Sequence, residues 1–181
     1  MSESDVSERA SRFAGVISAH LAAGSTILEI GAGEGGLATL LASAGHRVVA
    51  IDPKPRGAFP TIATTFEEYD AGSDRFDCVA AQFVLHHAAD LDRFLGKMAL
   101  LTRPDGIVAI DDYGWERSGD AAFRAERADL HTSHTMLERL ERSFDRIFYE
   151  DHGYSWEGYS DSRLAFIFVG RSRAVEEALT I

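Results

Sequence analysis

Three glycines at a fixed spacing precede a carboxylate that could bind the hydroxyl groups of a ribose. Gly31, Gly33 and Gly36 follow the apolar run 27–30, and Asp52 closes a second apolar run sixteen residues later. Glycines at a strand-to-helix turn allow positive φ and let a ligand approach the backbone. The helix that follows presents free N–H groups and the positive end of its dipole. A carboxylate at the tip of the adjacent strand is placed to accept both ribose hydroxyls. This pattern predicts a site for a nucleoside cofactor.

The glycine spacing alone fits two kinds of nucleoside cofactor. Gly31, Gly33 and Gly36 satisfy the dinucleotide fingerprint G-x-G-x-x-G. Residues 29–35, EIGAGEG, also resemble the first motif of the class I S-adenosylmethionine-dependent methyltransferases, in which an acidic and an apolar residue precede Gly-x-Gly-x-Gly. A second stretch, from Asp77 to Ile110, resembles the family's strand, its Val-Leu-His-His turn, its helix and its Pro-x-Gly. The remaining alternative at this point is an NAD-dependent oxidoreductase.

The elements expected along the chain favour the methyltransferase resemblance. Alternating strands and helices imply a doubly wound parallel sheet. The ending resembles the family's reversed last strand in a hairpin, whereas a dinucleotide-binding domain would continue with further strand–helix units. We therefore expect a single domain, 1–181, with an α/β Rossmann-like doubly wound sheet of the class I methyltransferase type, mostly parallel with a reversed last strand. The expected helices are 4–22, 35–44, 91–101, 121–130 and 135–142, and the expected strands are 26–30, 47–51, 61–65, 76–82, 107–111, 144–149 and 164–169.

Three connections stand out from this regular pattern. Residues 53–60 hold three of the four prolines, which excludes a normal helix and predicts a short, irregular crossover. Residues 103–106, Arg-Pro-Asp-Gly, are expected to form a turn before the fifth strand. The last two strands are expected to be joined by a long aromatic loop.

The resemblance implies S-adenosyl-L-methionine as the cofactor and assigns residues to its parts. Gly31 and Gly33 would approach the methionine part, Asp52 would hold the ribose, and Pro53 would pack on the adenine. Gln82, at the tip of the fourth strand, would lie under the sulfonium. The other expected cofactor residues are the acidic residue of the first motif and residues after the third strand: Glu29, Thr65 and Phe66. Many relatives use an acidic residue after that strand for the adenine amine, a contact for which this chain offers Glu67 or a threonine.

The catalytic candidates are His86, His87 and Tyr113, which follow the fourth and fifth strands. A histidine near the transferred methyl could take the proton of an acceptor hydroxyl or amine. In this family one histidine of the Leu-His-His stretch usually packs against the sheet. Methyl transfer from an activated sulfonium can also proceed by positioning alone. Both mechanisms stay open.

Aromatic residues near the carboxyl ends of the strands predict a pocket for a small, partly aromatic acceptor. The expected substrate-binding residues are Trp115, Tyr154, Trp156 and Tyr159. Segment 115–134 has few large apolar residues to anchor it, chiefly Phe123 and Leu130. We expect this segment, with Trp156 and Tyr159, to form a mobile lid.

The composition narrows the classes of partner. The 181 residues carry 29 acidic and 18 basic side chains, and a net charge of −11 disfavours nucleic acid as a substrate. There is no membrane-length apolar run, and the single cysteine, Cys78, is expected to be a buried small hydrophobe in a cytoplasmic protein. No metal is expected, because Asp111 and Asp112 are adjacent on a strand and point to opposite faces.

The expected function is S-adenosylmethionine-dependent methyl transfer to an oxygen or nitrogen of a small-molecule acceptor. The alternatives are an NAD-dependent oxidoreductase, and a methyltransferase-like subunit or cyclase that binds the cofactor without methylating. The sequence leaves the acceptor and the oligomeric state open.

Overall fold

A computed structural model describes residues 3–156 and 159–172, and the side chains of 8–153 and 164–172. Within these residues a single seven-stranded sheet has the order β3-β2-β1-β4-β5-β7-β6. The strands are β1 (Thr26–Ile30), β2 (Arg47–Asp52), β3 (Thr61–Ala63), β4 (Phe76–Gln82), β5 (Thr102–Tyr113), β6 (Phe144–Trp156) and β7 (Tyr159–Ser172).

The direction of the strands confirms the predicted sheet. β3, β2, β1, β4 and β5 pair in parallel, whereas β7 runs antiparallel to both β5 and β6. The carboxyl ends of the five parallel strands therefore meet at one edge, where ligands of open α/β sheets bind.

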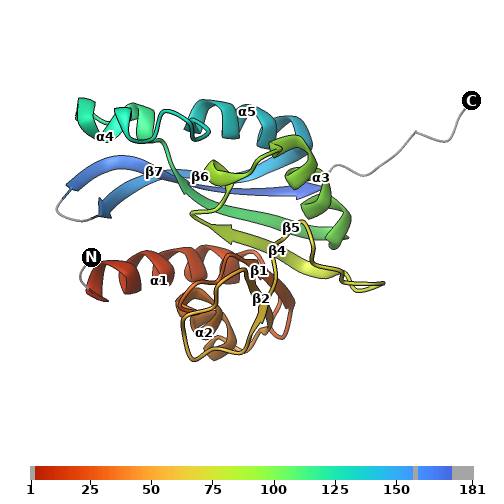
Figure 1. The fold of residues 1–181 in the computed structure, drawn as a ribbon. Coiled ribbons are helices and arrows are strands. Elements are labelled where there is room, and N and C mark those ends of the chain that lie inside the picture. The colour runs from red at the N-terminus through yellow and green to blue at the C-terminus, as the bar shows by residue number, and fades with distance from the viewer. Residues whose placement is uncertain (1–2, 157–158, 173–181) are drawn as a thin grey trace, which may run out of the picture.

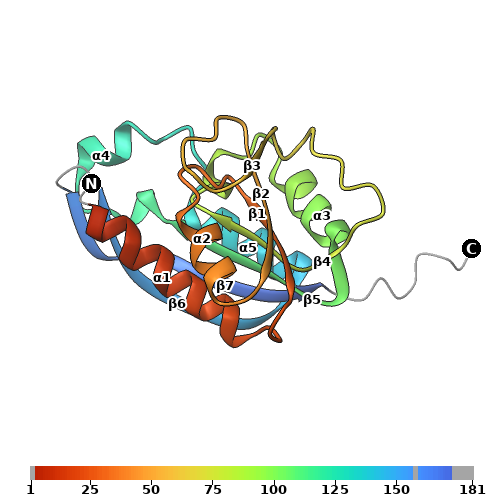
Figure 2. The ribbon, with the colours of Figure 1, turned by 90° about the horizontal axis from the view of Figure 1, so that it is seen from below.

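Helices cover both faces of the sheet (Figure 1). α1 (Glu3–Ala19) and α2 (Gly36–Ser43) lie on one face, and α3 (Leu91–Leu101), α4 (Ala121–Ala125) and α5 (Ser133–Ser143) lie on the other. The alternation of side chains along β1 builds both layers, because Ile27 packs with α1 and α2 while Leu28 packs with α3 and α5. Figure 2 shows α1 lying along β6 and β7, where Arg12 forms an ion pair with Glu150.

The irregular crossover at 53–60 is confirmed, since no helix joins β2 to β3. It packs tightly on the glycine-rich turn after β1. The Arg56 N–H donates to the Gly33 carbonyl at 3.0 Å. A Cβ on Gly57 would lie 1.8 Å from the Glu34 carbonyl oxygen, so only glycine fits there. β3 ends at Ala63, two residues earlier than expected.

Three expectations about the second half of the chain were wrong. Residues 103–106 are a bulge inside β5, because Phe76 pairs with Thr102 and Cys78 with Ile107. The helix expected over 121–130 ends at Ala125. Strands β6 and β7 replace the long aromatic loop and remain paired out to the register of Trp156 with Tyr159.

The β6–β7 pairing contains two register shifts, one between Arg146 and Phe148 and one between His152 and Tyr154, and the second falls at Gly153. Among the described residues, no helix combines the length and apolar character that crossing a membrane requires.

Candidate functional site

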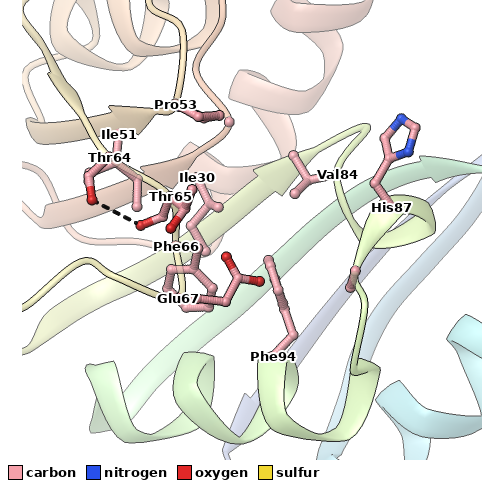
Figure 3. Close-up of a pocket in the computed structure, with 12 residues that line it drawn as sticks. Ile30, Ile51, Pro53, Thr64, Thr65, Phe66, Glu67, Val84, His87 and Phe94 are labelled. Atoms are coloured by element: carbon pink, nitrogen blue, oxygen red, sulfur yellow. Dashed lines mark hydrogen bonds between the residues drawn. The ribbon is translucent and has the colours of Figure 1, made fainter.

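A cavity of about 180 Å³ opens at the carboxyl ends of β1, β2 and β4 (Figure 3). His87 lies at the opposite end from Thr64 and Thr65, with Val84 between them. Five of the predicted site residues meet here: Gly31, Pro53, Thr65, Phe66 and His87. The other lining residues are largely apolar: Ile30, Ile51, Thr64, Glu67, Val84, Ala88 and Phe94. Predicted residues Glu29, Gly33, Asp52 and Gln82 lie on the adjoining strand ends and glycine turn and are not part of this lining.

The glycine turn has the backbone conformation that its sequence predicts. Gly31, Gly33 and Gly35 have φ values of 73°, 53° and 76°. At Gly31, however, the space that a side chain would fill is taken by the chain itself, since a Cβ would lie 2.5 Å from Val84 Cγ2. Val84 reaches this place because Phe83, at the end of β4, has a positive φ of 55°. Gly31 therefore makes room for a wall of the cavity.

Asp52 ties the tip of β2 to the glycine turn. Its Oδ2 accepts from the Gly33 N–H at 2.8 Å, and its Oδ1 accepts from the Lys54 N–H at 2.7 Å. Each carboxylate oxygen keeps a second lone pair, so these bonds leave acceptor capacity for a ligand hydroxyl.

Glu29 is a buried acid beneath the same turn, with 2% of its surface exposed. Burial raises its pKa to about 8; the nearby Asp52 carboxylate adds to this, and a hydrogen bond from the Ala38 N–H opposes it. Ala38 lies in the first turn of α2, where backbone N–H groups lack helical partners. Glu29 Oε2 has no hydrogen-bond partner among the described residues. The turn thus contains an unsatisfied buried oxygen.

Thr65 caps the turn that follows β3. Its hydroxyl accepts from the Glu68 N–H at 3.2 Å and donates to Glu68 Oε2 at 3.1 Å, and its carbonyl accepts from the Tyr69 N–H at 3.0 Å. The spacing T-x-x-E at 65–68 is the sequence signal for such a cap. This turn presents Phe66 and Glu67 to the cavity.

The two histidines after β4 occupy different environments. His86 is buried; its Nδ1 lies 2.6 Å from Asp112 Oδ1, and its ring meets Tyr113 edge-on at 4.7 Å. His87 is exposed at the cavity rim, with its ring 4.1 Å from that of His86. Partial burial and the neighbouring His86 lower the pKa of His87, which favours the neutral imidazole. Of the two, only His87 can meet a ligand in the cavity.

Asp111 and Asp112 point to opposite faces, as their adjacent positions on β5 predict. Asp111 accepts from Gln82 Nε2 at 2.7 Å and contacts His152 Nε2 at 2.9 Å. Burial raises the pKa of Asp111, and the bonds from His152 and Gln82 oppose that shift. Within the described part of the chain, no group of three His, Cys, Asp or Glu side chains is placed to share a metal ion.

The expected lid segment, 115–134, is not weakly held. Tyr113, Trp115 and Phe123 are buried in one cluster. Trp115 Nε1 donates to the His131 carbonyl at 3.0 Å, and the His131 N–H donates to the His86 carbonyl at 3.1 Å. Polar anchors of this kind leave little trace in a hydrophobic pattern. The expectation of weak anchoring is therefore wrong.

The other aromatic candidates lie on the antiparallel pair of strands β6 and β7, which we call the β6–β7 arm. The backbones of Tyr154, Trp156 and Tyr159 belong to paired strands, and their side chains lie outside the described residues. Trp115 is engaged in packing and does not line the cavity.

The sequence matches a family model described as a methyltransferase domain over residues 3–154. Curated relatives include the ubiquinone biosynthesis O-methyltransferase of Rhodopseudomonas palustris strain BisB5, 35% identical over 118 residues, or 57% of this chain and 46% of that protein. The protein of the same name from Methylocella silvestris is 36% identical over 98 residues, or 47% of this chain and 38% of that protein. The chain thus spans less than half the length of these relatives.

Solved structures share the fold. The 1,6-didemethyltoxoflavin-N1-methyltransferase of Burkholderia thailandensis, with bound 1,6-didemethyltoxoflavin and S-adenosylhomocysteine, superposes with a TM-score of 0.71 at 23% identity, covering 94% of this chain and 81% of that chain. The N-methyltransferase NodS of Bradyrhizobium japonicum WM9, in complex with S-adenosylhomocysteine, gives 0.71 at 18% identity, covering 91% and 86%.

Proposed function

We start from the finding that the chain belongs to the methyltransferase domain family and has the class I methyltransferase fold, and we propose that it binds S-adenosylmethionine. We further propose that it transfers the methyl group of this cofactor to an oxygen or nitrogen of a small molecule. The observation that carries the proposal is the cavity at the ends of β1, β2 and β4, directly beside the Asp52 carboxylate and the glycine turn.

The residues present fit an adenosine group. Pro53 and Val84 offer apolar surfaces for the base, and Glu67 offers an acceptor for its amine. Asp52 retains lone pairs for the ribose hydroxyls. The unsatisfied Glu29 oxygen beneath the turn supports a role in holding the ligand's methionine end, together with Gly31, Gly33 and Gln82. When bound, the cofactor supplies a methyl group already activated on a sulfonium.

We assign the general-base role to His87. It lines the cavity, and its lowered pKa leaves a free ring nitrogen for an acceptor proton at neutral pH. His86 and Asp112 are positioning residues, because their buried pair fixes the short turn that carries His87. Tyr113 packs on His86 and supports the same turn.

The acceptor belongs on the His87 side of the cavity. We retain Tyr154, Trp156 and Tyr159 of the β6–β7 arm as acceptor contacts, and Trp115 as packing support for that side. The relatives named above include both O- and N-methyltransferases, so we propose either atom. We also infer a cytoplasmic location, which is supported by the burial of Cys78, the chain's one cysteine.

Calorimetry on the purified chain tests the proposal, with S-adenosylhomocysteine and NAD as competing ligands. We expect binding of S-adenosylhomocysteine only. Binding of NAD alone would instead support the oxidoreductase, although the antiparallel β7 between β5 and β6 argues against a dinucleotide fold.

Transfer of labelled methyl to a panel of catechols and small amines then tests catalysis. Cofactor binding without transfer to any member of the panel would favour the non-methylating subunit or cyclase over our proposal.

A further inference from the structure

Lys97 of α3 reaches across to the turn that follows β3. Its Nζ donates to the carbonyl oxygens of Phe66, Glu67 and Tyr69 at 2.6, 3.0 and 2.7 Å. An ammonium group has three N–H donors, and all three are used here. The side chain is half-buried rather than extended into water. A lysine with every donor committed to one turn serves a structural purpose at that turn.

The same turn forms one wall of the cavity. Phe66 and Glu67 both line the cavity, and Figure 3 shows the Glu67 carboxylate and Phe94 on the side opposite Pro53. The centroid of the Phe66 ring lies 4.5 Å from the centroid of the Phe94 ring and 5.0 Å from Lys97 Nζ. Phe94 and Lys97 are three residues apart, so one face of α3 holds the wall.

Lys97 adds to the few contacts that hold this turn, and it binds the carbonyl groups rather than the amino end of the turn. Thr65 secures its amino end through the cap to Glu68. The crossover before β3 has no helix, and β3 itself has only three residues, so little backbone pairing fixes the turn after it. A cation at the carboxyl end of a turn also meets the negative end of its peptide dipoles.

We propose that Lys97 is a positioning residue for base recognition: by fixing the carbonyls of Phe66, Glu67 and Tyr69, it holds the Glu67 carboxylate where it distinguishes adenine from other bases. This inference rests on the proposed function. The inference adds Lys97 of α3 to the residues that determine cofactor specificity. Lys97 belongs neither to the glycine turn nor to β2, which carries Asp52.

The test compares two ligands that differ at the base amine. Affinities for S-adenosylhomocysteine and S-inosylhomocysteine, in which a carbonyl oxygen replaces that amine, are measured by calorimetry. The wild-type chain should prefer S-adenosylhomocysteine at least tenfold. In Lys97→Met the preference should fall to about threefold or less, chiefly through weaker binding of S-adenosylhomocysteine. The bond to the Glu67 carbonyl is exposed and the other two are only partly buried, so we expect water to replace the lost donors and the fold to survive.

Arg93→Met is the matched control, an exposed cation on the same helix, and should keep the wild-type preference. If Lys97→Met does not fold, Lys97→Gln, which keeps two N–H donors, carries the test, and its preference should also fall. An unchanged preference in a folded Lys97 variant would overturn the inference, as would a wild-type chain that binds both ligands equally. Failure of the wild-type chain to bind S-adenosylhomocysteine at all would overturn the proposed function instead.

Discussion

The burial of Glu29 predicts a specific dependence of stability on pH. Its pKa of about 8 in the folded chain stands well above the reference value of 4.5, and burial is the main cause. Between these values the folded state binds a proton that the unfolded state has released, so stability falls as pH rises. A shift of one pKa unit corresponds to about 1.4 kcal/mol, which gives a loss of about 4 kcal/mol between about pH 5 and pH 8.5.

The change Glu29→Gln removes this titration while keeping an oxygen that can accept from the Ala38 N–H. We expect the variant to gain stability relative to wild type as pH rises, by up to the same amount. Urea unfolding, followed by circular dichroism on ligand-free protein at a series of pH values, measures the difference. Other titrating groups cancel because they are common to both proteins. Glu34→Gln, at an exposed position in the same turn, should show no such trend. A stability difference between wild type and Glu29→Gln that stays constant with pH would refute the reasoning.

Four further changes test the site. Asp52→Ala should weaken S-adenosylhomocysteine binding more than tenfold, because hydrogen bonds to a charged acceptor contribute roughly 1.5–3 kcal/mol each; unchanged affinity in calorimetry would remove Asp52 from the ribose site. His87→Ala should abolish the acidic limb of the pH–rate profile, which lies below pH 6.5 because the His87 pKa is lowered from that value, and a retained limb would show that a group other than His87 titrates there and would remove His87 as the general base. His86→Ala should lower the melting temperature, since it leaves the buried Asp112 carboxylate short of a partner. Gly31→Ala should destabilise the chain by about 1–3 kcal/mol through its positive φ and the contact with Val84. Adding Val84→Ala should recover part of that loss in a thermal melt, and a strictly additive pair would show that the contact is not the cause.

The sequence predicts the central parallel strands β1 and β4 because each contains a short, largely apolar run between turn residues. Residues 27–30 and 78–81 are buried on both faces, and apart from Glu29 they form continuous hydrophobic segments. The β6–β7 arm lacks that signal beyond about residue 150, where acidic residues, glycine and serine interrupt the pattern. Beyond residue 150 each of these two strands is held by hydrogen bonds to the other, and their pairing contains two register shifts. No local sequence pattern encodes this register.

The residues of the candidate site also fall into those with a local sequence signal and those without one. Residues that act through the backbone, such as the glycines and the Thr65 cap, have local signals in spacing. Residues that act through a distant partner do not. The sequence places His86 and His87 side by side, and only the packing of Asp112 from β5 assigns one to the interior and the other to the cavity. Lys97 likewise is an ordinary helical lysine until the turn at 66–69 is folded against α3.

The short turn after β4 connects the two sides of the proposed site. Its His87 lies at the rim of the cavity, while its His86 and Ala88 carbonyls accept hydrogen bonds from the His131 N–H and side chain at 3.1 and 2.8 Å. His131 in turn accepts from Trp115, so segment 115–134 is bonded to the turn that carries the proposed base. Because these hydrogen bonds share one short turn, we expect segment 115–134 and the turn that carries His87 to belong to one cooperative unit.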